Sequence, residues 1–443
     1  MSPCRIFVTG GSGYVGGQII QYLVQQNQTT QQHQYEVYAM ARSESSQRTV
    51  EGYGAIPVHC SLTTLTKERF PNDVDIIIHS AACAKDWGPY EEYYESNVIG
   101  TKQLLQVAND VLLEPPAAAA AAAGESSSTT TPTISPDNNS NNNDTKTKKM
   151  GRKTMLFIHV GTEAVHFDDN DKTDLSNLCE ETAPPLQFQS QFPYTSTKAH
   201  AEKLVTDANS SLLKTIVLRP RIVWGPGDTT ILPTLLRIVE DGGFWWINHG
   251  QAKTSVCHID NLTEAVHCCI RSFLQHTNDD DKDTTTPTTA ATTSTTTTSS
   301  STIPPKLEEI CGHAYYIADD GTVTQKDFFT QYVSVSTGGR TALPNRSIPY
   351  YWVVMNVAWF LTKVWDWVGQ PMRWMPPLTP MAIYILGNDI TLQTTKAKTK
   401  LQWKPIITTE EGLHQLSLVA SRTTTPTTPI AADDGTTTTK KKQ

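Results

Sequence analysis

Residues 5–16 read Arg5-Ile-Phe-Val-Thr-Gly-Gly-Ser-Gly-Tyr-Val-Gly16, an apolar run that passes into a glycine-rich turn. An amphipathic helical pattern, Gly17-Gln-Ile-Ile-Gln-Tyr-Leu-Val24, follows at once. Gly10 permits a tight turn, Gly13 lets the backbone approach a pyrophosphate, and Gly16 lets the helix pack closely on the strand. The stretch therefore predicts a strand, a phosphate-binding turn and a helix.

This turn predicts a dinucleotide site at the start of the helix. A helix N-terminus presents free N–H groups and the positive end of a dipole to phosphates. A strand and helix joined in this way are typical of a doubly wound parallel α/β sheet of the Rossmann type. We expect the cofactor to lie against Gly10, Gly13, Tyr14, Val15 and Gly16.

The choice of cofactor depends on the second predicted strand, residues 35–42, which should end beside the adenosine ribose. Sites that prefer NAD carry an acidic residue there, whereas this chain has Arg42, which suits a 2′-phosphate. NAD or NADP is therefore expected, with NADP favoured by Arg42. Ser61 and Leu62 should lie near the adenine, and the small residues Ala81 and Ala82 let the cofactor approach the backbone.

Three segments of biased composition bury too little apolar surface to fold and are predicted to be disordered. They are 115–153, which begins with polyalanine, the Thr/Ser-rich stretch 277–305, and the Thr-rich tail 421–443. The rest suits one Rossmann core with a small C-terminal substrate lobe. We assign the core to 1–114 and 154–224, and the lobe, with additional core elements, to 225–276 and 306–420.

Charge and cysteine usage argue against a nucleic-acid partner and against a metal site. The formal net charge is −8 and no basic stripe is present, which argues against nucleic acid. The eight cysteines include no Cys-x-x-Cys pair, so we expect reduced thiols and no metal site.

The chain enters its first strand without a signal peptide, so we expect it in the cytoplasm or on the cytosolic face of the endoplasmic reticulum.

Tyr194 and Lys198 stand four residues apart, which places a phenol and an ammonium on one helix face. A cation beside a tyrosine favours its phenolate and lowers its pKa, so that the tyrosine can exchange a proton with an alcohol or a carbonyl. Thr162 ends the strand 154–162, at the sheet edge where ligands bind. Thr162 is therefore expected to hydrogen-bond the substrate oxygen while Tyr194 moves the proton.

These motifs occur in an order that resembles the extended short-chain dehydrogenase/reductase superfamily. The matching residues are Thr9–Gly16, Asn97–Thr101, Thr162–Val165, Tyr194 with Lys198, Leu218–Pro220 and Trp224–Gly227. Within it, residues 79–82, 87–94 and 256–262 resemble the branch of 3β-hydroxysteroid dehydrogenases and sterol-4α-carboxylate 3-dehydrogenases. The resemblance covers nearly the whole chain outside the three biased segments.

The resemblance implies a role for each matching residue. Tyr194 would be the general acid/base, Lys198 would hold the nicotinamide ribose, and Thr162 and Asn97 would complete the catalytic set. Pro220 would line the cofactor. Two departures matter for the cofactor: the acidic residue after the second strand is missing, and Ser61 replaces an aspartate that often contacts adenine.

The segment 350–368 is the most apolar region of the chain. Its uncharged run, 350–362, is 13 residues long and falls short of the ~20 that a spanning helix needs. Its tryptophans suit a membrane interface, so we expect a helix that lies on a bilayer. The alternative is a helix that packs on the protein's own substrate lobe. The oligomeric state remains open.

The predicted reaction is the oxidation of a secondary alcohol, with the 3β-hydroxyl of a steroid or sterol-like molecule as the expected substrate. The aromatic stretch 242–248 favours a wide apolar pocket, although such residues also form cores. Three alternatives stay open. They are a nucleotide-sugar epimerase or dehydratase, a flavonoid or cinnamoyl-type ketone reductase, and a protein that binds the cofactor without turnover.

Overall fold

The computed structural model describes residues 3–29, 34–85, 87–113, 153–168, 174–280, 306–364 and 379–423. The segments predicted to be disordered, 115–153, 277–305 and 421–443, lie outside these ranges except at their edges. At those edges, helix α8 continues to Asp280 and helix α14 to Thr423. The last residues of the apolar segment, 365–368, also lie outside the described residues.

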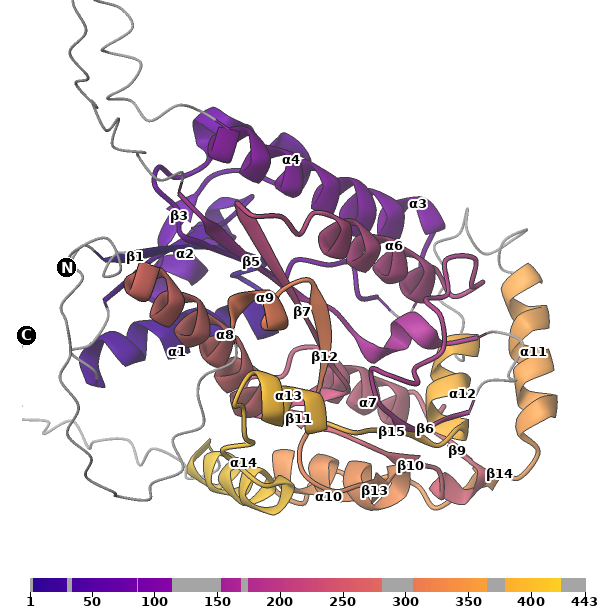
Figure 1. The fold of residues 1–443 in the computed structure, drawn as a ribbon. Coiled ribbons are helices and arrows are strands. Elements are labelled where there is room, and N and C mark those ends of the chain that lie inside the picture. Colours follow the sequence, from indigo (N-terminus) through magenta and orange to yellow (C-terminus); the bar gives the residue numbers. More distant parts are fainter. Residues whose placement is uncertain are drawn as a thin grey trace, which may run out of the picture.

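A parallel sheet of seven strands forms the centre of the molecule (Figure 1). Its order is β12-β7-β5-β4-β1-β2-β3, and every neighbouring pair is parallel. The strands are β1 (Cys4–Thr9), β2 (Tyr35–Met40), β3 (Ile56–Val58), β4 (Ile76–His79), β5 (Met155–Val160), β7 (Leu213–Pro220) and β12 (His313–Ile317). The chain runs outward from β1 to β3 and then returns to β4, which creates the switch point where such sheets bind ligands. The predicted doubly wound fold is confirmed.

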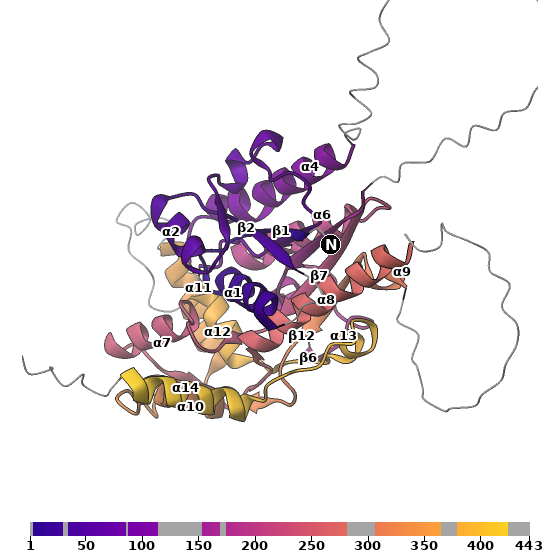
Figure 2. The same cartoon turned by 90° about the vertical axis from the view of Figure 1, so that its left-hand side faces the viewer.

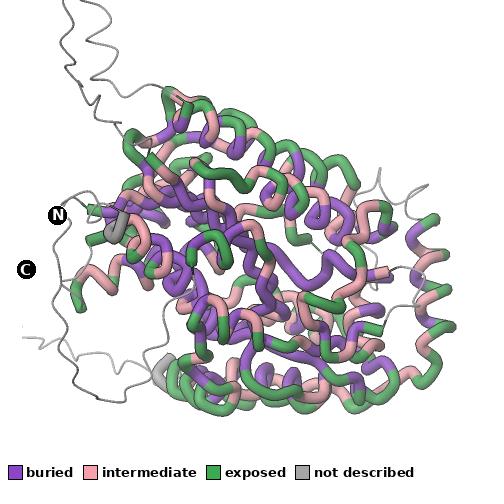
Figure 3. Tube along the Cα trace, in the orientation of Figure 1, coloured by how far each residue is buried: buried purple, intermediate pink, exposed green. Residues whose placement is uncertain are grey.

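Helices cover both faces of this sheet, as Figures 1 and 2 show from two sides. On one face α1 (Tyr14–Thr29) packs beside α8 (Ile259–Asp280), and on the other α4 (Gly100–Leu113) packs beside α6 (Pro193–Asp207). Each pair encloses its own apolar cluster, because the strands are apolar on both faces. The buried residues therefore follow the central strands in Figure 3. The shorter helices of this layer are α2 (Glu44–Gly52), α3 (Tyr90–Tyr93), α9 (Leu307–Ile310) and α13 (Thr395–Lys400), with the turns η1 (Leu62–Thr64), η2 (Lys67–Arg69), η3 (Tyr94–Ile99) and η4 (Glu163–His166).

A second, smaller sheet has the order β13-β10-β15-β6. Its strands are β13 (Val323–Thr324), β10 (Lys253–Thr254), β15 (Ile390–Leu392) and β6 (Leu175–Leu178). Two-residue ladders join β8 (Val223–Trp224) to β11 (Cys257–His258) and β9 (Trp246–Ile247) to β14 (Ser347–Ile348). The helical elements of this region are α7 (Ile231–Glu240), η5 (Asn248–Gly250), α10 (Gln325–Ser336), α11 (Tyr351–Val364), α12 (Pro380–Gly387) and α14 (Thr409–Thr423). Because β12 and α8 return to the large sheet, the two layers are built from alternating pieces of the chain.

The aromatic stretch 242–248 forms core in this smaller region. Phe244 and Trp246 are buried in an apolar cluster with Trp224 and Phe328. Trp245 is exposed and lies under the guanidinium of Arg346, 4.9 Å from its carbon. These aromatic side chains therefore stabilise the lobe and give no direct support for a wide substrate pocket.

Asn261, at the start of α8, ties the C-terminal segment to the core. Its Nδ2 donates to the carboxylate of Asp319 at 2.7 Å and to the carbonyl of Ile407 at 2.8 Å. Its Oδ1 accepts from the backbone N–H groups of Ile406 and Ile407, at 2.7 and 3.1 Å. The side chain is fully buried, so each of these bonds forms away from water.

Replacing Asn261 with alanine should lower the free energy of unfolding by about 3 kcal/mol, because it leaves buried backbone groups and the Asp319 carboxylate without their partner. Urea denaturation followed by circular dichroism measures the change. Asn345→Ala is the control, since Asn345 is exposed and accepts a hydrogen bond from the side chain of Lys326. An equal effect of the two substitutions would contradict the role of Asn261 in holding the C-terminal segment to the core.

Candidate active site

The glycine turn after β1 packs so closely against its neighbours that only glycine fits at two of its positions. Gly10 has φ +73°, and a Cβ there would lie 2.8 Å from the backbone nitrogen of Ala81. A Cβ on Gly16 would lie 2.3 Å from the Gly10 carbonyl oxygen, so only glycine allows α1 to begin this close to β1. The first turn of α1 carries no acidic side chain. The turn therefore fits the pyrophosphate of a dinucleotide.

The other residues predicted for this end differ in how they can contribute. The side chains of Tyr14 and Val15 pack toward the core, so they can reach a cofactor only through their backbone. Ala81 donates its N–H to Thr9 Oγ1 at 3.2 Å and is partly exposed, while Ala82 is exposed. Small residues thus follow β4 beside the turn, as expected. Pro220 ends β7 at the same edge and is buried.

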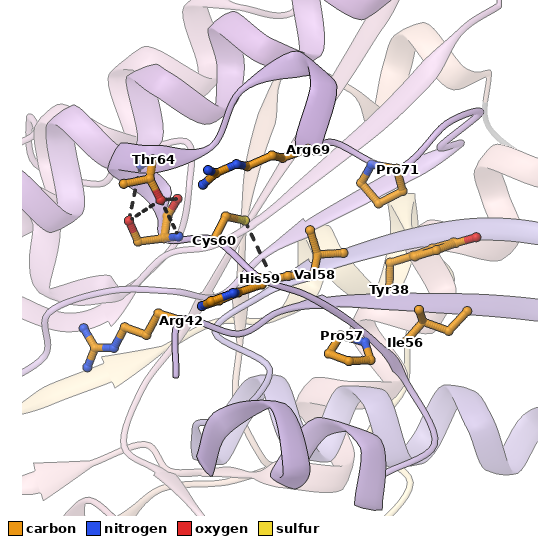
Figure 4. A pocket seen from close by; sticks show the side chains of 11 residues that line it. Tyr38, Arg42, Ile56, Pro57, Val58, His59, Cys60, Thr64, Arg69 and Pro71 are labelled. Atoms are coloured by element: carbon orange, nitrogen blue, oxygen red, sulfur yellow. Dashed lines mark hydrogen bonds between the residues drawn. The ribbon is translucent and has the colours of Figure 1, made fainter. Parts of the chain in front are cut away.

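An open pocket of about 780 Å³ lies beside β2 and β3 and the residues that follow them (Figure 4). Its lining includes the predicted residues Arg42 and Ser61, and also His59, Thr64 and Arg69. Ser61 accepts from the N–H of Thr64 and caps η1. Leu62, by contrast, is buried and packs against Gly100. Two guanidinium groups therefore border this pocket, and sequence reasoning identified only that of Arg42.

Tyr194 and Thr162 lie next to each other at the carboxyl end of β5. Pro193 starts α6, and the side chain of Thr162 accepts from the N–H of Ala164 at 3.2 Å as the N-cap of η4. Burial has the largest effect on the pKa of Tyr194 and raises it. The charge of Glu163 raises this pKa further, and a hydrogen bond with Thr162 lowers it. The sequence predicts that Lys198 lowers this pKa; the structure shows that burial and Glu163 raise it instead.

Lys198 is buried, and its ammonium is held by the sheet. Its Nζ donates to the carbonyl oxygen of Val160 at 2.9 Å and lies 3.3 Å from His159 Nε2. Burial lowers the pKa of Lys198 to about 8, against a smaller opposing effect of Glu202. Lys198 is thus fixed below Tyr194 by the end of β5, and it stays protonated only up to mildly alkaline pH.

Two buried histidines extend this arrangement below the site. His79 Nδ1 lies 2.7 Å from Thr9 Oγ1, and its Nε2 lies 2.9 Å from Thr101 Oγ1. Burial lowers the pKa of His79 to about 3 and holds that of His159 well below its usual range. Both rings are therefore neutral, and His159 can accept a hydrogen bond from the Lys198 ammonium. Sequence reasoning did not identify either histidine.

Asn97 joins the loop after β4 to α6, the helix that carries Tyr194 and Lys198. Its Oδ1 accepts from the N–H of Cys83 at 2.7 Å, and its Nδ2 donates to the Cys83 carbonyl and to Thr197 Oγ1. It sits in a π-helical turn, η3, and is buried. These contacts position the loop after β4 against α6 beside Lys198, so Asn97 acts here as a positioning residue.

A buried ion pair, Glu163 with Arg221, lies directly behind Thr162. Thr162 Oγ1 donates to Glu163 Oε2 at 2.9 Å, and Arg221 Nη1 donates to Glu163 Oε1 at 2.5 Å. Arg221 Nε also donates to Thr254 Oγ1. Sequence reasoning missed this pair. Opposite charges just past the ends of two strands, at 163 and 221, were the signal that could have revealed it.

An apolar wall stands beside Tyr194. Tyr194 packs in a cluster with Phe192, Tyr384 and Met355, and the ring of Trp359 stacks on that of Phe192 with centroids 5.8 Å apart. These contacts bring α11 and α12 from the C-terminal part of the chain against the start of α6. The inner face of α11 therefore packs on the protein itself, as the alternative interpretation of this segment predicted.

The outer face of α11 remains exposed, as its place at the margin of the molecule in Figure 1 suggests. Trp352 and Phe360 are each 67% exposed, and Val353, Val357 and Val364 on the same helix are exposed as well. Among the helices that the structure describes, none is long and apolar enough to cross a membrane.

The parallel sheet, the glycine turn and the Thr/Tyr/Lys set together define a dinucleotide-dependent oxidoreductase of the short-chain type. Residues 6–280 match the model of the NAD dependent epimerase/dehydratase family, and the chain belongs to this family. The resemblance to the extended short-chain dehydrogenases is thereby confirmed.

Two relatives by sequence and one solved structure with the same fold illustrate the similarity. A 4-hydroxy-2-methyl-3-oxo-4-farnesyl-3,4-dihydroquinoline-1-oxide ketoreductase of Stigmatella aurantiaca is 25% identical over 413 residues, 93% of this chain and 95% of that protein. A decarboxylating sterol-4-alpha-carboxylate 3-dehydrogenase of Dictyostelium discoideum is 23% identical over 419 residues, 93% of this chain and 99% of that protein. UDP-glucuronic acid 4-epimerase of Bacillus cereus, solved with NAD, shares the fold with a TM-score of 0.57 at 15% identity, over 94% of this chain and 97% of that one.

Lys198 should make stability depend on alkaline pH. Its pKa is about 8 in the folded protein and 10.5 when unperturbed, so the unfolded chain binds more protons between these values. Unfolding free energy therefore rises with pH across this window, by on the order of 3 kcal/mol from this group. Lys198→Met should remove that rise, as urea denaturation between pH 7.5 and 10.5 can measure.

Lys203→Met is the matched control, because Lys203 lies on the same helix, is exposed and pairs with Asp207. Its pH dependence should match that of the wild type. A Lys198→Met protein with the wild-type slope would contradict the placement of a buried, protonated lysine.

Proposed function

We propose that this protein is an NAD(P)-dependent dehydrogenase/reductase that interconverts a secondary alcohol and a ketone on a large apolar molecule, with the 3β-hydroxyl of a steroid or sterol-like compound as its substrate. The observation that carries this proposal is the apolar wall beside Tyr194, formed by Phe192, Met355, Trp359 and Tyr384. Apolar ring systems bind to such surfaces, with a few polar groups to orient them.

The bound dinucleotide would supply the hydride acceptor or donor. Tyr194 would take the proton of the alcohol or return it to the carbonyl oxygen, since it is the titratable side chain that packs beside the apolar wall. Thr162 would hydrogen-bond the same oxygen when its hydroxyl turns from Glu163 toward the substrate. Lys198 would place a positive charge below Tyr194 and favour its phenolate.

Relatives support this class of substrate. The Stigmatella relative is named as a ketoreductase of a farnesylated quinoline and the Dictyostelium relative as a sterol carboxylate dehydrogenase. Both printed substrates are apolar ring systems with an oxygen at a ring carbon. We infer that this protein likewise catalyses both the oxidation of such an alcohol and the reduction of the corresponding ketone.

The second candidate, a nucleotide-sugar epimerase or dehydratase, fits the solved structures that share the fold. Free cationic groups favour a nucleotide diphosphate, whereas Arg219 and Arg221, near the site, pair with Glu202 and Glu163. An assay of free nicotinamide absorbance separates the two. A stoichiometric change with a sterol or ketone supports the dehydrogenase, and turnover of a UDP-sugar without such a change supports the epimerase.

Replacing Tyr194 with phenylalanine should reduce kcat by at least about a thousandfold, because it removes the group that exchanges the proton. Cofactor affinity, measured by quenching of tryptophan fluorescence, should change by less than about threefold, a shift of under 1 kcal/mol. Retained turnover would contradict the proposed mechanism. A parallel loss of cofactor binding would instead indicate a folding defect.

Arg42 is proposed to select NADP through its 2′-phosphate. Arg42→Ala should weaken NADPH binding by about tenfold and leave NADH binding nearly unchanged, because a charge-assisted hydrogen bond to the phosphate is lost. Fluorescence titration with each cofactor measures both affinities. Arg48→Ala is the control, since Arg48 is exposed and pairs with Glu44. Equal losses for both cofactors would argue against selection by Arg42.

We further propose that the outer face of α11 rests on a lipid surface, from which an insoluble substrate reaches the apolar wall. Trp352→Ser combined with Phe360→Ser should reduce cosedimentation with phosphatidylcholine vesicles several-fold, because two exposed aromatic anchors are lost. Leu113→Ser, an exposed apolar residue on α4, should leave it unchanged. Wild-type protein that stays in the supernatant would contradict the proposal.

A further inference from the structure

The ion pair of Glu163 and Arg221 has no role in the mechanism above, yet it touches a catalytic residue. Both side chains are buried, and Glu163 also raises the pKa of Tyr194. Removing an ion pair of this kind from water has a cost that hydrophobic packing would avoid. A buried carboxylate at this place therefore invites a functional explanation.

Hydrogen bonding limits what Thr162 can do. Its hydroxyl has one proton, which it donates to Glu163 at 2.9 Å, and its oxygen accepts from the N–H of Ala164. A hydrogen bond from Thr162 would lower the pKa of Tyr194. While the Thr162 proton points to Glu163, that bond is not made, and Thr162 can only accept from the phenol. A protonated Tyr194 therefore finds an acceptor, whereas a phenolate would face an oxygen without a proton for it.

We propose that Glu163, held in place by Arg221, is a positioning residue that keeps Tyr194 protonated and thereby adapts the site to the reduction of a ketone. The inference rests on the proposed function and gives its direction at neutral pH. Glu163 acts in two ways, since it draws the proton of Thr162 away from Tyr194 and places a negative charge close by. A protonated tyrosine is the state that can donate to a carbonyl oxygen.

Other charged groups surround Tyr194 and contribute in defined directions. Lys198, on the same helix, carries a positive charge of the kind that favours a phenolate, and Glu202 favours the charged form of Lys198. Arg221 partly offsets the charge of Glu163, and Cys83 has a smaller effect on Tyr194. From the strands below, His159 and His79 are neutral, and Arg219 is paired with Glu202.

The test compares pH profiles of kcat/KM in both directions for the wild type and Glu163→Gln. The amide removes the charge and can donate to Thr162, which frees the threonine proton. We expect the alkaline limit of ketone reduction and the acidic limit of alcohol oxidation to move to lower pH together, by on the order of one pH unit. In a Thr162→Val background the shift caused by Glu163→Gln should be smaller. The hydrogen bond through Thr162 is then missing, and only the charge of Glu163 can act on Tyr194.

Glu202→Gln is the matched control, because Glu202 is an equally buried partner of an arginine, Arg219. Thermal unfolding should show comparable losses of stability for the two variants. The control should move the profile toward higher pH or leave it in place, since it weakens the charge on Lys198 rather than freeing Thr162. This contrast separates a positioning role from general destabilisation.

Three outcomes would overturn the inference. They are an unchanged profile in Glu163→Gln, a shift to higher pH, or the same shift in Glu202→Gln. A wild-type protein that turns over neither alcohols nor ketones with either cofactor would instead overturn the proposed function, and this inference with it. Active wild-type enzyme with an unmoved profile overturns the inference alone.

Discussion

The contact between the Lys198 ammonium and the Val160 carbonyl, 2.9 Å long, connects the chemistry of this protein to its fold. Val160 is the last residue of β5, so its carbonyl lies at the sheet edge where the site is formed. The contact fixes the position of α6 relative to the carboxyl end of β5. Tyr194, one turn earlier on α6, is thereby placed beside Thr162, which follows β5 directly.

A buried ammonium is costly, and the surroundings of Lys198 are arranged to tolerate it. The carbonyl of Val160 and the neutral ring of His159 accept its protons, and Glu202 lies one turn further along α6. Glu202 is itself neutralised by Arg219. Positive and negative groups therefore alternate from β7 through α6 to the reacting tyrosine, and each substitution in this series changes the charge balance of the next group.

Much of this arrangement could be predicted from the sequence. The glycine turn, Thr162, Tyr194 and Lys198 all lie in local patterns whose spacing has a physical meaning, and the parallel sheet follows from apolar strands that alternate with helices. The carboxyl ends of the strands meet at one edge, so residues that follow different strands could be placed together. Arg42 and Ser61 were found in this way.

The groups that escaped prediction act through contacts between distant parts of the chain. Glu163 and Arg221 are 58 residues apart, and their positions after two strands do not by themselves show that the side chains meet. His79 and His159 end apolar strands, where a neutral buried histidine is indistinguishable in sequence from a core residue. The apolar wall requires α11 and α12 to return to α6, which no local pattern specifies.

The smaller layer explains how one sheet edge can serve a particular substrate. Dinucleotide binding uses the N-terminal turn and the ends of β1 to β4, which belong to the first part of the chain. The wall beside Tyr194 comes from helices that arrive some 160 to 190 positions later in the sequence, as the separation of Phe192 from Trp359 and Tyr384 shows. Since the wall packs against the start of α6, substitutions in α11 or α12 can alter the substrate surface while the cofactor turn stays in place.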